Sequence, residues 1–229
     1  MIKAVIFDLD NTLIDFMKMK KAAVNAAVDA MISAGIKMPK EEATKALYEL
    51  YDKYGIEYQQ IFQKFLQKTN RKVDYKILAA GIVAYRKVQP SFLEPYGSAV
   101  PTLLRLREQG LKLAIVSDAP RLKAWLRLVE MKLQDFFDVV VCHEDTNQYK
   151  PSSLPFLKAL KKLKFLPEEC IMVGDWPERD IRGAKQLGMK TVFAKYGAVR
   201  EVADSGADFE ISNISELLKV VEKVNRNER

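Results

Sequence analysis

The chain has 229 residues, of which 48% are hydrophobic, and its 37 Lys and Arg against 30 Asp and Glu give a formal net charge of +7. This length and composition exclude an intrinsically disordered chain and favour a globular protein with a substantial core. No run approaches the ~18 apolar residues of a membrane span, and the opening MIKAVIFDLD does not resemble a secretory signal. We therefore predict a soluble, cytoplasmic protein that does not bind membranes.

The excess of basic residues does not indicate nucleic-acid binding. The lysines alternate with apolar residues in segments such as LKALKKLKFL, a pattern typical of solvated helix faces. The sequence contains no aromatic RNA-stacking motif and no long basic arm. The two cysteines, Cys142 and Cys170, lie beside apolar runs without metal-ligand spacing, so we expect them to be buried free thiols.

The first predicted element is a strand over residues 2–7, IKAVIF, a short apolar run typical of a buried parallel strand. The pattern then becomes helical. Apolar residues recur at helical spacing in four segments without an intervening strand pattern, around residues 24–32, 41–54, 61–66 and 78–83. Residues 15–95 are therefore predicted to form a separate module of about four helices.

After the Pro- and Gly-rich stretch QPSFLEPYG at residues 89–97, helices and strands alternate. Such alternation predicts a parallel sheet with helices on both faces. The predicted fold is α/β, with a Rossmann-like core formed by residues 1–14 and 96–229 and the helical module inserted between them. The expected strands lie at residues 111–117, 138–142, 170–175, 190–194 and 207–211, and the expected helices at 100–109, 122–129, 152–163, 181–187 and 214–224.

Polar residues follow four of the predicted strands at the point where each strand ends. In an open parallel sheet, ligands bind beyond the carboxyl ends of the strands, so we expect these residues to meet at one edge. Singly, each has a structural explanation, such as a helix cap or a solvated lysine; the functional hypothesis depends on their occurring in order in one chain. They are Asp8, Asp10, Asn11 and Thr12 after the first strand, Ser117 and Asp118 after the second, Lys150 after the third with a loop between, and Asp175 after the fourth, with Asp180 five residues on.

The types of these residues point to phosphoryl transfer. Three carboxylates at one edge (Asp8, Asp10 and Asp175) are costly unless a cation neutralises them, and oxygen-only ligands favour Mg²⁺ or Ca²⁺ over zinc. Ser117 and Lys150 offer a hydroxyl donor and a positive charge to phosphoryl oxygens. One carboxylate can attack phosphorus to give an aspartyl-phosphate, and a second one can exchange protons with the leaving group and with water.

Four motifs formed by these residues resemble those of the haloacid dehalogenase-like superfamily. IFDLDNT resembles its first motif, DxDx[TV]; AIVSD resembles the second, YKP the third and VGDWPERD the fourth. The helical segment at residues 16–90 looks like the small cap that one large subgroup inserts after the first motif. The resemblance implies a Mg²⁺-dependent phosphatase for small phosphorylated metabolites such as glyceraldehyde 3-phosphate, phosphoglycolate or sugar phosphates.

The resemblance also implies a role for each residue. Asp8 would be the nucleophile and Asp10 the general acid/base. Mg²⁺ would be held by the Asp8 side chain, the Asp10 backbone carbonyl and Asp175. The phosphoryl group would be held by Ser117, Lys150 and the backbone amide of Asn11, with Asp118 beside them, while Thr12 and Asp180 would support the site.

Two positions depart from the commoner family pattern. Asp118 stands where many relatives have Asn, which puts its contact with substrate in doubt. Four residues, WPER, separate Asp175 from Asp180, whereas three is the commoner spacing, so which acid contacts the metal directly is open.

Three alternatives remain open. A 2-haloacid dehalogenase of this family needs the nucleophile but no metal, and those of this type lack the second acid of the first motif, whereas Asp10 is present here. A phosphomutase needs Asp10 and a cap contact that returns the phosphate. A non-catalytic interaction protein on this fold is disfavoured because the set of acids, serine and lysine is complete. The sequence allows a monomer or a homodimer.

Overall fold

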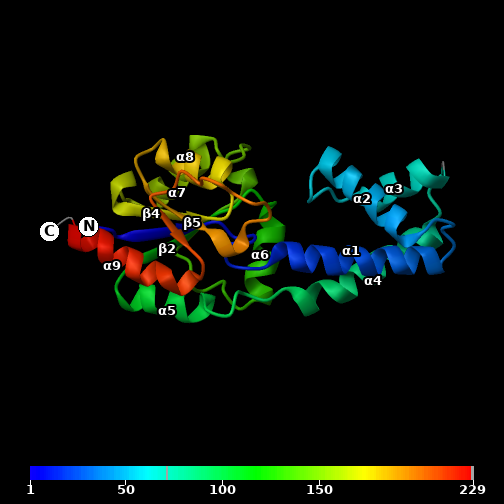
Figure 1. Cartoon of the computed structure of the whole chain (residues 1–229), viewed down its shortest axis with the longest axis horizontal. Coiled ribbons are helices and arrows are strands. Elements are labelled where there is room, and N and C mark those ends of the chain that lie inside the picture. The colour runs from blue at the N-terminus through cyan, green and yellow to red at the C-terminus, as the bar shows by residue number, and fades with distance from the viewer. Residues whose placement is uncertain (71, 228–229) are drawn as a thin grey trace. The chain divides into compact units, whose positions relative to one another are not determined.

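The computed structural model describes residues 1–70 and 72–227. The chain divides into two compact units. Unit 1 consists of Met1–Phe16 and Glu94–Arg229, and unit 2 of Met17–Leu93 (Figure 1).

Unit 1 contains a six-stranded sheet in the order β3-β2-β1-β4-β5-β6, and all its neighbouring strands are parallel. The predicted α/β class and parallel sheet are confirmed. The central strand β1 is fully buried, as its unbroken apolar sequence predicted. The strands are β1 (Ala4–Phe7), β2 (Lys112–Val116), β3 (Val139–Val141), β4 (Cys170–Gly174), β5 (Lys190–Ala194) and β6 (Phe209–Ile211).

Helices cover both faces of this sheet (Figure 1). Side chains of α7 and α8, including Phe156, Leu160 and Ala184, pack against the residues of β1–β4 that point to one face. The opposite face is covered by α5 and α9 (Figure 1). The helices of unit 1 are α5 (Ala99–Glu108), α6 (Arg121–Glu130), α7 (Ser153–Leu163), α8 (Arg182–Lys185) and α9 (Leu217–Asn227), with short 3₁₀ helices at His143–Asp145, Pro167–Glu169, Lys195–Gly197 and Ile214–Glu216.

Between β4 and α8 the chain makes a π-helical turn, Pro177–Ile181, in which the backbone N–H of Arg182 donates to the carbonyl of Pro177 five residues earlier. The sequence predicted a regular helix over residues 181–187, and the observed α-helix is shorter and follows this wider turn. A π turn takes up one more residue than an α turn and is frequent at functional sites. It therefore accommodates the additional residue between Asp175 and Asp180.

Unit 2 contains four helices within its described residues, with a core of their apolar faces. Helices α1 and α4 approach closely because Gly81 lies against the side chain of Met31, where a Cβ would overlap its sulfur and Cγ. Lys20 is buried beside the ring of Tyr51 and donates to the Tyr85 hydroxyl at 3.2 Å. The helices are α1 (Phe16–Ser33), α2 (Lys40–Tyr54), α3 (Ile61–Asn70) and α4 (Tyr75–Phe92).

The chain leaves unit 1 and returns to it at adjacent points. Ile14 forms an antiparallel bridge with Pro95, and the backbone N–H of Tyr96 donates to the carbonyl of Leu13 at 2.9 Å. The segment between them is therefore inserted at a closed junction. Within the described residues, no helix combines the length and apolarity that crossing a membrane requires.

Candidate active site

The register of the central strands brings the predicted site residues to one edge of the sheet. Phe7, the last residue of β1, pairs with Ile115 of β2 and with Val173 of β4. The residues that follow these strands therefore emerge side by side. The backbone N–H of Asp8 still donates to the carbonyl of Val173, at 2.9 Å, which fixes the start of the turn after β1.

The turn after β1 is held from several sides. Asn11 adopts a left-handed conformation with φ of 59°, which Asn tolerates better than most residues. Thr12 is fully buried; its hydroxyl donates to Asp175 Oδ1 at 3.2 Å, and its carbonyl accepts from the Tyr196 hydroxyl at 2.7 Å. A side chain at Gly197 would overlap the carbonyl oxygen of Asn11. The geometry of this turn therefore depends on residues almost 190 positions away in the sequence.

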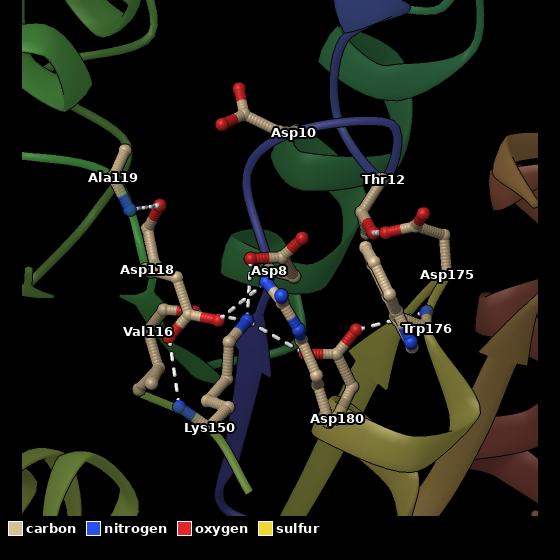
Figure 2. Close-up of polar contacts among 12 residues, drawn as sticks. Asp8, Asp10, Thr12, Val116, Asp118, Ala119, Lys150, Asp175, Trp176 and Asp180 are labelled. Atoms are coloured by element: carbon tan, nitrogen blue, oxygen red, sulfur yellow. Dashed lines mark hydrogen bonds and ion pairs between the residues drawn. The ribbon is translucent and has the colours of Figure 1, made fainter. Parts of the chain in front are cut away.

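Lys150 lies at the centre of the site, with only 4% of its surface exposed. Its Nζ donates to Asp8 Oδ1 at 2.6 Å and to the carbonyl of Val116 at 3.0 Å, and it forms an ion pair with Asp180 Oδ1 at 2.6 Å (Figure 2). Burial alone would lower the pKa of Lys150, but the carboxylates of Asp180 and Asp8 outweigh it and raise the pKa well above its ordinary value. The lysine therefore stays charged.

Three buried carboxylates gather beside this lysine. One oxygen from each of Asp8, Asp175 and Asp180 lies within 4.8 Å of the others. Burial, with the charge of Asp8, raises the pKa of Asp175 and of Asp180, although Lys150 opposes the rise. A raised pKa marks carboxylates that lack sufficient positive charge. The cluster of hard oxygen donors thus fits a divalent cation of the Mg²⁺ or Ca²⁺ type.

Asp180, which the sequence predicted as a supporting residue, is held tightly in this cluster. Asp180 is 1% exposed, and its Oδ2 accepts the backbone N–H of Trp176 at 3.0 Å across the π-helical turn. Gly174 makes room for it, since a Cβ there would overlap the Asp180 side chain. The structure thus places Asp180 in the same cluster as Asp8 and Asp175, which the sequence did not establish.

Ser117 and Asp118 follow β2. The hydroxyl of Ser117 accepts the backbone N–H of Ala119 at 3.1 Å, which leaves its own O–H able to donate to an anion. Asp118 Oδ1 accepts the backbone N–H of Lys150 at 2.9 Å, and Oδ2 accepts from Arg179 Nη1 at 3.2 Å. Asp118 therefore orders the loop that carries Lys150, a role that explains why this position accepts an acid.

Asp10 stands apart from this group. Its side chain is directed away from Lys150 (Figure 2), and it is not among the three clustered carboxylates. Asp10 Oδ2 instead accepts from Arg127 Nη1 on α6 at 2.6 Å. The roles of Arg127, Tyr196 and Gly197 were not predictable from the sequence, because nothing near them along the chain indicates a contact with the turn after β1.

The comparisons with known proteins agree with this geometry. The sequence pattern of the family described as haloacid dehalogenase-like hydrolase matches residues 5–194. This chain belongs to that family. The match runs from the central strand through the four motifs to the end of β5. It includes every site residue predicted from the sequence, whereas Tyr196 and Gly197 follow its last residue.

Relatives over the full length are named as phosphatases. The chain is 36% identical over 230 residues to a glyceraldehyde 3-phosphate phosphatase of Methanopyrus kandleri, covering 98% of this chain and 99% of the relative. It is also 36% identical over 231 residues to the enzyme of that name from Pyrococcus furiosus, covering 100% and 96%. A crystal structure described as a HAD phosphatase from Thermococcus onnurineus superimposes with a TM-score of 0.72 at 30% identity, over 96% of this chain and 98% of that one.

Proposed function

We propose that this chain is a Mg²⁺-dependent phosphatase that hydrolyses monoesters of small phosphorylated metabolites, with glyceraldehyde 3-phosphate as the leading candidate substrate. The observation that supports this most strongly is the position of Lys150, which contacts Asp8 and Asp180, two of the three clustered carboxylates. A nucleophilic carboxylate, a fixed cation and a metal-type oxygen cluster together suit phosphoryl transfer. The names of the full-length relatives support this reaction and this substrate.

In the proposed first step, the Asp8 carboxylate attacks phosphorus. The bond from phosphorus to the ester oxygen breaks as the bond to Asp8 forms, and the ester oxygen takes a proton from Asp10 and leaves as an alcohol. The product is an aspartyl-phosphate on Asp8. In the second step Asp10 accepts a proton from water, which attacks the phosphorus, releases inorganic phosphate and restores the Asp8 carboxylate.

The surrounding residues would stabilise the negative charge that spreads over the phosphoryl oxygens. The Lys150 ammonium and the Ser117 hydroxyl would bind these oxygens, since both lie at the sheet edge beside Asp8, and the backbone amide of Asn11 would add a third donor. A divalent cation held by Asp8, Asp175 and the Asp10 carbonyl, with Asp180 in support, would neutralise charge on the nucleophile and the phosphoryl group.

We further propose that residues 15–95 act as a cap domain. Such a cap excludes water during the first step and contributes to the choice of substrate. The cytoplasmic location and the monomeric or homodimeric state stay predictions.

The test is phosphate release from a panel of phosphorylated metabolites, measured with Mg²⁺ and with EDTA for the wild type, for Asp8→Asn and for the surface control Asp135→Asn. We expect Mg²⁺-dependent release that Asp8→Asn abolishes and Asp135→Asn, whose side chain contacts the neighbouring Gln134, preserves. Halide release from 2-haloacids, or transfer of phosphate between positions of one sugar without net release, would replace the proposal with a dehalogenase or a mutase. No turnover and no Mg²⁺-induced stabilisation would favour an interaction protein.

A further inference from the structure

Helix α6 places a charged side chain in the interior next to the proposed proton carrier. Arg127 is 3% exposed, and its Nη1 lies 2.6 Å from Asp10 Oδ2. Its guanidinium also stacks on the ring of Phe16, 4.5 Å from the ring centroid. Burying an arginine is costly unless it is paired with good geometry, so a side chain held in this way has a defined orientation.

The backbone of Asp10 is already fixed by the turn after β1. The N–H of Leu13 donates to the carbonyl of Leu9 at 3.0 Å, which closes the turn on both sides of Asp10. What remains variable is the pair of side-chain torsions of Asp10. A short charge-assisted bond from a buried guanidinium restricts these torsions, because guanidinium and carboxylate prefer a narrow set of mutual geometries.

The direction in which Arg127 holds Asp10 suits proton transfer. In phosphoryl transfer the leaving oxygen departs on the side of phosphorus opposite the nucleophile. A proton donor for that oxygen therefore has to lie on the side of the phosphoryl group away from Asp8, apart from Lys150 and from the three clustered carboxylates. Figure 2 shows Asp10 directed away from Lys150, and Arg127 holds it there.

We propose that Arg127 is a positioning residue that fixes the side chain of Asp10 for proton transfer to the leaving group, an inference that rests on the proposed phosphatase function. Loss of Arg127 removes the ion pair that directs the Asp10 carboxylate away from Lys150. The reaction should therefore slow for esters whose leaving group needs a proton. Alkyl esters leave as strongly basic alkoxides, whereas 4-nitrophenolate leaves without protonation.

The experiment compares kcat/KM for the best alkyl phosphate of the panel with that for 4-nitrophenyl phosphate, in the wild type and in Arg127→Met. The value of kcat/KM includes the steps only up to release of the first product, so hydrolysis of the aspartyl-phosphate does not enter it. We expect the alkyl ester to lose about 10- to 100-fold, part of the about 10²–10⁴-fold that general acid catalysis supplies, and the aryl ester to lose less than about threefold. Arg127→Lys, which keeps a buried cation, should recover part of the loss and carries the test if Arg127→Met does not fold.

Two further variants separate positioning from a general structural effect. Arg121→Met removes an exposed arginine of the same helix, paired with Asp145 at 3.2 Å, and should change neither substrate. In an Asp10→Asn background, loss of Arg127 should not change the ratio of the two substrates further, because Arg127 acts through Asp10.

Equal losses on both esters, increased activity on the alkyl ester, or the same change of ratio in the Asp10→Asn background would overturn the positioning role. Absence of phosphate release by the wild type is a different result, which overturns the proposed function and this inference with it.

Discussion

Lys150→Met removes a cation that contacts both Asp8 and Asp180 while it keeps an unbranched apolar side chain of nearly the same length. Both contacts are 2.6 Å long, and the lysine is 4% exposed, so water cannot replace it without rearrangement. Removing one partner of a buried ion pair costs about 3–5 kcal/mol, because the remaining charge is left uncompensated. We expect a loss of unfolding free energy of this size at pH 7 in EDTA.

For a protein of this size, each 1 kcal/mol lowers Tm by about 2–4 °C, so the expected decrease in Tm is about 6–20 °C. Mg²⁺ should recover more stability in Lys150→Met than in the wild type, because the variant site is more negative and a ligand stabilises the state that it binds. The loss should shrink at pH 5, because burial raises the pKa of Asp180 and protonation can then remove the charge that the substitution leaves uncompensated there.

Thermal unfolding with EDTA and with Mg²⁺, at pH 5 and pH 7, measures these effects. Lys185→Met is the matched control, since Lys185 is 53% exposed in its side chain and 4.0 Å from Asp208, and exposed pairs contribute at most about 1 kcal/mol. A Lys150→Met protein as stable as the wild type in EDTA at pH 7 would refute the assignment of Lys150 as the compensating charge of the cluster.

Three other changes have defined outcomes. Burial and neighbouring carboxylates raise the pKa of Asp175 from 3.8 to about 9, so the cation-free folded state binds this proton more tightly than the unfolded state does. The bound proton therefore stabilises the folded state at low pH, and this stabilisation is lost as the pH rises toward 9. The increase in Tm on adding Mg²⁺, which competes with this proton, should therefore grow from pH 5 to pH 8, and a constant increase would contradict the assignment. Gly197→Ala forces a methyl group against the carbonyl of Asn11. It should lower the free energy of unfolding by about 1–3 kcal/mol in denaturant unfolding and remove most of the phosphatase activity. The control Gly97→Ala, where open space surrounds the added methyl group, should change neither quantity. Thr12→Val removes the 3.2 Å hydrogen bond to Asp175 and should lower the free energy of unfolding by about 1–3 kcal/mol. It should also weaken Mg²⁺ binding in a calorimetric titration. An unchanged affinity for Mg²⁺ would show that Thr12 stabilises only the turn.

The fold was predictable because its signals are local. β1 is an unbroken apolar run that ends at two acids, and burial on both faces of a parallel sheet produces that pattern. Cys142 and Cys170 are buried free thiols, as their apolar surroundings predicted. The meeting of Asp8 and Asp175 follows from topology, since residues that end parallel strands share an edge. Lys150 reaches the same edge through the loop after β3, which Asp118 holds.

The contacts across the site were not predictable, and helix α6 shows why. Apolar residues at i, i+3, i+4 and i+7 normally mark the buried face of a helix. On α6 this stripe is exposed, and the buried face includes Arg127. A buried arginine cannot be identified from periodicity, because its burial depends on Asp10, 117 residues away. The exposed stripe consists of Leu122, Trp125, Leu126 and Val129, with exposed fractions of 70%, 39%, 54% and 57%.

The closed junction at Ile14 and Pro95 has a consequence for how this protein can change. Unit 1 already holds the two ends of the insertion together through a bridge and the hydrogen bond from Tyr96 to Leu13. For the folding of unit 1, the inserted segment acts as a long loop whose two ends are already held together. Each doubling of the length of a flexible loop costs only about 0.6 kcal/mol in closure entropy. Insertions, deletions or wholesale exchange of the segment at residues 17–93 can therefore accumulate without disturbing the strand ends that carry Asp8 and Lys150. With the cap role proposed for residues 15–95, this junction would allow substrate choice and chemistry to evolve separately.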